Sequence, residues 1–246
     1  MPQDQLLSRR QLLAVSAALS GIVLSAPLNP LIAGLANEGK PTSENGPATE
    51  GVVISKPAPE KRPTPDQVMG PFYPATKPVD RDADLTVIQG RPGKAKGQVI
   101  YLMGRVFNLK GEPIRGTEIE IWQANTYGRY THPSDKNPAP LDPNFQGFGI
   151  QTTDSEGRFR FKTVKPGAYQ VTADWTRPPH IHFDVTSKSN RLITQMYFEG
   201  ELLNEKDLLY KCTMDKESLL TKPMPATKDM EPEALIAVWD IVLPQI

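Results

Sequence analysis

Short runs in which apolar and polar side chains alternate dominate the chain after Gly97. Residues 118–122 and 158–162 both alternate with a period of two, the spacing that turns one face of a strand toward a core. Turn residues, chiefly Gly, Pro and Asp, separate these runs. The pattern predicts strands at residues 99–103, 118–122, 158–162, 168–171, 180–185, 192–198 and 237–243.

A helical spacing is found over residues 202–211. Many short strands joined by turns, with few short helices, are typical of an all-β chain built as a β-sandwich. The 25 prolines agree with this fold class, because proline interrupts helices but suits short connections between strands. We therefore expect a mostly all-β sandwich whose core lies between two sheets.

The N-terminal residues have the character of a targeting signal. Arg9 and Arg10 precede the apolar run 12–26, which is too short and too mildly apolar for a convincing membrane span. Small residues at 34–36 offer a cleavage site. Residues 1–36 are therefore expected to be a twin-arginine signal peptide, with the export machinery as a partner and a periplasmic or secreted location. The alternative is an uncleaved N-terminal anchor; after cleavage we expect no stable membrane span.

A proline-rich stretch follows the predicted signal. Nine prolines lie between residues 37 and 80, amid Ser, Thr, Gly and charged residues. Such a composition cannot bury a core of its own, so we expect residues 37–65 to be a linker and residues 66–246 to be the folded domain. Two aromatic residues, Phe72 and Tyr73, stand between turn residues and serve either as a plug on the domain or as part of a pocket.

Charge and cysteine content narrow the function classes. The 28 basic and 28 acidic residues balance, so there is no electrostatic reason to expect nucleic acid as a partner. The single cysteine, Cys212, excludes an intrachain disulfide, and we expect it to be a small buried side chain.

The sharpest local motif is His180-Ile181-His182 within the predicted strand 180–185. Side chains alternate along a strand, so both histidines share one face, about 7 Å apart along the backbone, while Ile181 faces the core. Two such imidazoles can converge on one metal ion, and they are two of only three histidines in the chain. A solvated polar face is the other interpretation. His132 and Cys212 are the candidates for completing a zinc site, but their spacing does not favour one.

A family resemblance extends this motif. The stretch Leu102–Tyr130, with its turn glycines, an apolar-acid-apolar strand and a terminal Gly-x-Tyr, resembles the intradiol ring-cleavage dioxygenases. The resemblance continues through Lys165-Pro166-Gly167-Ala168-Tyr169, residues 177–183 and Gln195-Met196-Tyr197-Phe198-Glu199-Gly200, and it covers about residues 66–200. Within the family, the motifs are most similar to those of protocatechuate 3,4-dioxygenases.

The resemblance implies a non-haem iron enzyme. Its Fe(3+) ligands correspond to Tyr130, Tyr169, His180 and His182. Phenolates are hard anionic donors, which suits a hard trivalent ion. The resemblance further implies that Tyr169 leaves the iron and takes a substrate proton, that Arg177 stabilises charge on the ring, and that Gln195 lies beside the site. The substrates would be a catechol-type molecule and O2, and the product a muconate-type diacid.

Some features depart from that pattern. Val171 stands where the protocatechuate enzymes often have a tryptophan, and no residue is evident that would bind a substrate carboxylate. Two other functions stay open: an exported prealbumin-like module for adhesion or binding without catalysis, and a hydrolytic site with a different metal. Because one chain carries a complete ligand set, a homo-oligomer or a monomer is more economical than an obligate pair of unlike subunits.

Overall fold

A computed structural model describes residues 60–228 and 230–244 of the chain. The predicted signal peptide, residues 1–36, and residues 37–59 of the predicted linker lie outside the described residues. Within the described part, no helix has the length and apolar character needed to cross a membrane.

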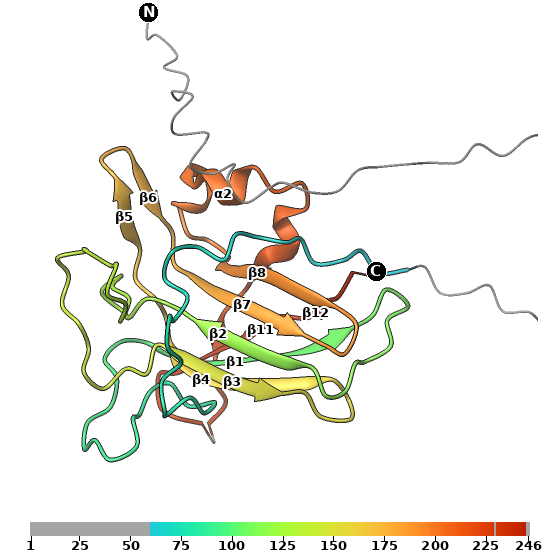
Figure 1. The fold of residues 1–246 in the computed structure, drawn as a ribbon, viewed down its shortest axis with the longest axis horizontal. Coiled ribbons are helices and arrows are strands. Elements are labelled where there is room, and N and C mark those ends of the chain that lie inside the picture. Colours follow the sequence, from blue (N-terminus) through green and yellow to red (C-terminus); the bar gives the residue numbers. More distant parts are fainter. Residues whose placement is uncertain (1–59, 229, 245–246) are drawn as a thin grey trace, which may run out of the picture. The chain divides into compact units, whose positions relative to one another are not determined.

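Two five-stranded sheets form the fold (Figure 1). In the first sheet the order is β10–β11–β1–β12, with β4 also paired to β1. Its strands are β1 (Val99–Phe107), β4 (Arg158–Val164), β10 (Met224–Pro225), β11 (Leu235–Val238) and β12 (Ile241–Val242). In the second sheet the order is β3–β2–β7–β8–β9. Its strands are β2 (Glu118–Trp122), β3 (Phe148–Thr152), β7 (His180–Thr186), β8 (Arg191–Phe198) and β9 (Leu220–Thr221).

The remaining elements are short. A two-stranded hairpin, β5 (Tyr169–Thr172) and β6 (Trp175–Arg177), projects from the sheets beside α2 (Figure 1). The helical segments are η1 (Asn204–Lys206), α2 (Leu208–Lys211) and η2 (Lys216–Leu219). The β-sandwich with few short helices is therefore confirmed.

The core lies between the two sheets and follows the predicted alternation. Ile100 and Leu102 of β1 are fully buried, and so are Ile181, Phe183 and Val185 of β7. Each such side chain contributes about 1.5–3 kcal/mol when it is removed from water, so this alternation holds the two sheets together.

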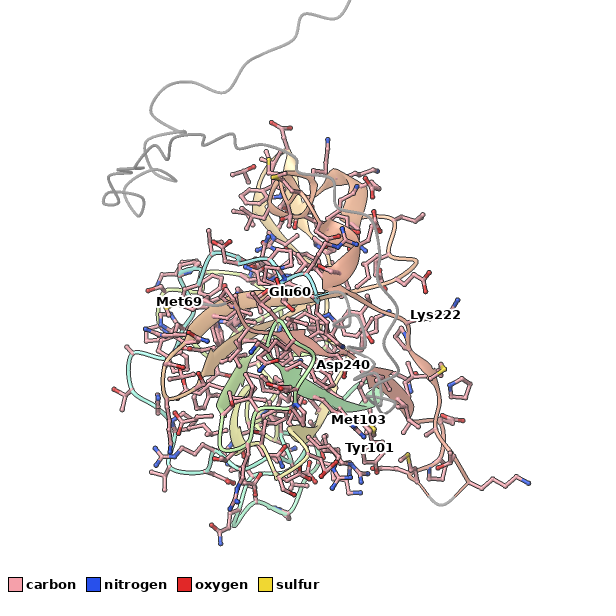
Figure 2. The ribbon with its side chains drawn as sticks, turned by 90° about the vertical axis from the view of Figure 1, so that its right-hand side faces the viewer. Glu60, Met69, Tyr101, Met103, Lys222 and Asp240 are labelled. Carbon is pink, nitrogen blue, oxygen red and sulfur yellow. The ribbon has the colours of Figure 1, made fainter. Side chains whose placement is uncertain are left out.

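The outer face of β7 is also buried, which the alternation alone does not require. The segment 60–80 crosses it and hydrogen-bonds to β8: the Gln67 amide donates to the Ile193 carbonyl at 2.8 Å, and Gln195 Nε2 donates to the Val68 carbonyl at 2.7 Å. Figure 2 shows Met69 of this segment well apart from Tyr101 and Met103, which lie on the first sheet. The site described below therefore lies on the outer side of the second sheet.

Three local expectations are wrong. The predicted strand 237–243 is two strands, β11 and β12, interrupted at Trp239 and Asp240. The predicted helix 202–211 is broken at Asp207, whose extended backbone (φ −79°, ψ 123°) separates η1 from α2. Cys212 is exposed, because it follows α2 in a surface segment.

The interruption between β11 and β12 depends on Gly104. The Trp239 amide donates to the Met103 carbonyl at 2.9 Å, and a Cβ atom on Gly104 would overlap the Trp239 carbonyl oxygen. Backbone atoms cannot yield as a flexible side chain can, so only glycine lets the two strands lie this close.

Replacing Gly104 with alanine should lower the free energy of unfolding by about 2–4 kcal/mol, because the added methyl group must separate β1 from Trp239. Urea unfolding followed by circular dichroism measures this. The control is Gly116→Ala: Gly116, unlike Gly104, has a positive φ of 71°, but a Cβ there meets nothing within 4 Å. The free energy of unfolding of this variant should fall by only about 1 kcal/mol, because of backbone strain. Equal losses in both variants would contradict the proposed overlap.

Candidate metal and active site

Strand β7 places His180 and His182 on its buried outer face, each 2% exposed. His180 Nδ1 lies 2.7 Å from the Pro178 carbonyl oxygen, to which it donates, so Nε2 is left with its lone pair free. His182 is stacked on Trp122 of β2, with ring centroids 4.8 Å apart and an interplanar angle of 11°. Both rings are therefore held in fixed orientations by neighbours.

Tyr130 comes from the loop that follows β2 and is 3% exposed. Asn125 Oδ1 accepts hydrogen bonds from the Tyr127 and Arg129 amides, at 2.9 and 3.1 Å, and so forms a tight turn. Asp135 Oδ2 then accepts from the Tyr130 amide at 2.7 Å. Polar side chains thus fix the loop on both sides of Tyr130.

Two glycines bring the Tyr130 loop against the start of β5, where Tyr169 lies. Gly128 has a positive φ of 80°, and a Cβ atom on it would overlap the Ala168 carbonyl. A Cβ on Gly167 would meet the Gly128 amide and the Thr126 carbonyl. The close backbone contact that both glycines permit places the two tyrosines side by side.

The four predicted ligand residues lie together. The Tyr130 and Tyr169 rings are 5.6 Å apart between centroids, the two histidine rings 5.0 Å, and Tyr169 and His180 5.7 Å. Tyr130 Oη lies 3.5 Å from His180 Nε2. Two donors bound to one metal at about 2 Å are separated by roughly 3 Å, so little adjustment would be needed for both to bind the same ion.

An unpaired buried atom also fits a metal at this place. His182 Nδ1 is buried without a hydrogen-bond partner in the described structure. Within the described ranges, no three His, Cys, Asp or Glu side chains gather in a metal-binding arrangement, so a four-ligand site around the histidines has to include the tyrosines. The assignment of the four residues as iron ligands stays a prediction, and the geometry is compatible with it.

Arg177 ends β6, directly opposite Tyr169 in the hairpin, and is 4% exposed. Its Nη2 donates to Gln195 Oε1 at 2.7 Å and to Tyr197 Oη at 2.9 Å. Gln195 and Tyr197 are the cross-strand partners of His182 and His180, so β8 carries both beside the ligands. The guanidinium is therefore part of a buried network and not of a surface ion pair.

Sequence reasoning missed Asp207 as a member of this network. The Arg177 guanidinium forms a salt bridge with the Asp207 carboxylate, with Nε 3.1 Å from Oδ1, and Asp207 is fully buried. The signal in the sequence was weak, because Asp207 lies inside the stretch with helical spacing. An acidic residue there is ordinarily interpreted as part of a solvated helix face.

Phe72 and Tyr73, the aromatic pair between turn residues, pack against different neighbours. Phe72 packs on Tyr130, with centroids 4.6 Å apart, and so forms a wall of the site. Tyr73 packs on Trp122 instead, at 5.0 Å, and its hydroxyl donates to Glu120 at 2.6 Å. His132 is partly exposed, and its ring lies 5.9 Å from that of Phe72.

Burial determines the protonation states. It lowers the pKa of His180 and of His182 well below the usual value, and the positive charge of Arg177 adds to this effect. Both imidazoles are therefore neutral near pH 7, the form that binds metals. Burial raises the pKa of Tyr130 and of Tyr169, so each phenol keeps its proton until a cation displaces it.

The depressed histidine pKa values predict an acid-sensitive fold for the metal-free protein. Unfolded histidine takes up a proton near pH 6.5, whereas folded His180 and His182 do so only at lower pH. Stability should thus change little between about pH 7 and 9 and fall between about pH 6.5 and 5.5, by up to about 1.4 kcal/mol per pH unit for each imidazole. Urea unfolding across this range measures it.

The double variant His180→Asn/His182→Asn should lose this dependence, and His132→Asn, as the matched control, should keep it. An unchanged slope in the double variant would refute the explanation.

Comparison with known proteins places this site in a family. Residues 68–245 match the family described as Dioxygenase. The protocatechuate 3,4-dioxygenase beta chain of Burkholderia cepacia is 42% identical over 180 residues, which are 70% of this chain and 76% of that protein. The catechol 1,2-dioxygenase of Candida albicans is 30% identical over 148 residues, 54% of this chain and 46% of that protein, so this chain spans about half of its length.

A solved structure agrees. The dioxygenase domain of a dioxygenase carbohydrate-binding protein fusion from Streptomyces sp. SirexAA-E is 27% identical, with a TM-score of 0.55 over 75% of this chain and 100% of that one. The family match over residues 68–245 includes the segments that carry all four donor rings. The chain therefore belongs to the dioxygenase family.

Proposed function

We propose that the protein is a ferric non-haem dioxygenase of the intradiol type. It would cleave a catechol-type ring between the two carbons that bear the hydroxyls and insert both atoms of O2, giving a muconate-type diacid. One catechol and one O2 account for all the atoms of the product, so no organic cofactor is needed. The observation that carries the proposal is the convergence of two phenols and two imidazoles in one buried site of a dioxygenase-family chain.

The iron would be held by Tyr130, Tyr169, His180 and His182. Two phenolates and two neutral imidazoles suit Fe(3+), because anionic oxygen donors stabilise the trivalent ion. When bound, the ferric ion draws electron density from the oxygens of the catechol and so makes a ring carbon reactive toward O2.

Tyr169 has the properties of the proton acceptor. It is the ligand on the projecting hairpin and is partly exposed, whereas Tyr130 is enclosed by its loop. Burial raises the pKa of Tyr169 while the charge of Arg177 opposes that rise. A phenolate with a raised pKa is a competent base, so Tyr169 Oη can take a proton from a substrate hydroxyl.

Arg177 supplies positive charge next to the ligands from within a buried network. In such surroundings a fixed cation stabilises negative charge on the substrate more strongly than it would in water. Gln195 holds the Nη2 end of the guanidinium and is itself held by the Val68 carbonyl at 2.7 Å. Its proposed role is therefore to orient Arg177 rather than to react.

The ring substituents are left open by this proposal. The relative with 42% identity is named for protocatechuate, and the one from Candida albicans for catechol. Val171 of β5 is 46% exposed and supplies no aromatic wall where protocatechuate enzymes often have a tryptophan. We therefore propose a catechol-type substrate without assigning it a carboxylate.

Assembly and location belong to the proposal as well. Arg9, Arg10 and the apolar run after them support export through the twin-arginine route to the periplasm or beyond. The name "beta chain" of the Burkholderia cepacia relative indicates an assembly in that protein. Since this chain carries all four donor residues itself, we propose a homo-oligomer or a monomer rather than an obligate pair of unlike subunits.

Oxygen uptake against a panel of catechols tests the function directly. The iron-loaded protein should consume one O2 per catechol, and mass spectrometry should find a product equal in mass to the catechol plus O2. The protein should also show a visible absorption band from tyrosinate bound to ferric iron. Absence of uptake with every catechol, from protein that carries iron, would overturn the proposal.

His182→Ala should lose bound iron and the visible band, because it removes one of four ligands and leaves a gap beside Trp122. Turnover should fall at least about 100-fold. His132→Ala is the matched control, since this third histidine is partly exposed and is not among the proposed ligands; it should keep iron content and turnover within about twofold. Iron content by elemental analysis decides; full iron in His182→Ala would remove that residue from the ligand set.

A further inference from the structure

Asp207 lies immediately before helix α2, at a position where an aspartate side chain ordinarily caps the helix. It is the N-cap residue of α2, where an aspartate side chain commonly accepts a hydrogen bond from the first turn of the helix. No such bond is made here. The helix thus forgoes its cap, although Asp207 is fully buried and a buried carboxylate needs partners.

The Asp207 carboxylate instead accepts hydrogen bonds from two residues of β6. Asp207 Oδ1 accepts from Trp175 Nε1 at 2.9 Å, and Oδ2 accepts from Arg177 Nη2 at 3.1 Å. The backbone of Asp207 is fixed on both sides, since its amide donates to the Asn204 carbonyl and its carbonyl accepts from the Lys211 amide. Asp207 therefore ties the hairpin that carries Tyr169 and Arg177 to the η1–α2 segment.

This arrangement leaves one end of Arg177 free. Asp207 takes Nε and Nη2, and Gln195 and Tyr197 share Nη2 as well. Among the described residues, no well-formed hydrogen bond from Nη1 is seen, and the guanidinium also interacts with the Tyr169 phenol, whose pKa it lowers against the effect of burial. With Nε and Nη2 fixed, the guanidinium plane cannot rotate, so the direction of the Nη1 donors is set before substrate arrives.

The negative charge of Asp207 also compensates the positive charge of the buried Arg177. A buried guanidinium without an anion would be strongly disfavoured, whereas the pair with Asp207 is nearly neutral overall. Arg177 can therefore stay desolvated next to the two neutral histidines. Without the negative charge of Asp207, the guanidinium would repel a metal ion from them. The other acceptors of the guanidinium, Gln195 and Tyr197, carry no charge.

We propose that Asp207 is a positioning residue of the reaction: it holds Arg177 so that Nη1 faces the substrate, and it anchors the hairpin that carries Tyr169. This inference rests on the proposed function, because it assigns Arg177 its role there. Asp207 does not touch the reacting atoms and acts through Arg177.

A double-mutant cycle tests the coupling. In iron-loaded protein, Asp207→Asn should lower kcat about 30-fold, the effect of losing one charge-assisted hydrogen bond, with KM, iron content and visible band within about twofold. In the Arg177→Gln background the same change should lower kcat less than about threefold, since the residue it acts through is gone. Equal fold losses in both backgrounds would overturn the proposal. Asp174→Asn, at the exposed turn of the same hairpin, is the matched control and should leave kcat unchanged.

A second variant keeps the test valid if Asp207→Asn fails to fold. Trp175→Phe removes one donor from the carboxylate but keeps its charge. It should lower kcat about threefold, and this loss should disappear in the Arg177→Gln background. A loss that persists there would count against the proposal.

A readout independent of turnover separates this inference from the proposed function. Exchange of the Arg177 Nε proton with water can be followed by 15N NMR in full-length protein loaded with Ga(3+), a diamagnetic trivalent ion. The exchange should be slow in the wild type and in Asp174→Asn, and at least about tenfold faster in Asp207→Asn. Unchanged slow exchange would refute positioning by Asp207 whatever the reaction is. Slow wild-type exchange without any oxygen uptake would instead refute the function alone.

Discussion

The structure depends on four polar rings that gather over the outer face of β7 and are largely shielded from water. Imidazole and phenol groups in such a place need partners, and a buried nitrogen without one lowers stability. Here the covering segments supply few acceptors: His180 has one carbonyl, and His182 Nδ1 has no partner in the described structure. A cation shared by the four rings would satisfy them all together. The burial that leaves these rings short of partners would therefore also favour binding of a metal ion.

The enclosure is built from segments far apart in the chain. Phe72 lies on the segment 60–80, Tyr130 on the loop after β2, and Tyr169 on the projecting hairpin. Only the histidines share a strand. Because glycines at 128 and 167 allow backbone to touch backbone, the loop and the hairpin behave as one wall. Regular strands provide the base of the site, and irregular loops provide its specific chemistry.

Periodicity made most of the longer strands predictable, but not β3, the short strands β6, β9 and β10, or the connections between strands. Alternation identified both faces of β7, and the motifs around Tyr130 and Tyr169 selected residues that the structure brings together. The break between β11 and β12 was not predictable, because it arises from a contact between Gly104 and Trp239, which lie far apart in sequence. The role of Asp207 was not predictable for a similar reason. Its importance comes from Arg177, thirty positions away, and local spacing carries no information about that pairing.

The cover of the site also has a consequence for how the domain comes to be formed. The Thr64 amide donates to the Val242 carbonyl at 2.9 Å, and the Val242 amide donates to Thr64 Oγ1, so the covering segment is fastened to a strand made 178 positions later. During synthesis this segment emerges early, and β8, to which it also bonds, is made before β12. The full set of contacts that holds the segment over the outer face of β7 can therefore form only once β12 has been synthesised, so this cover depends on a contact between positions far apart in the chain.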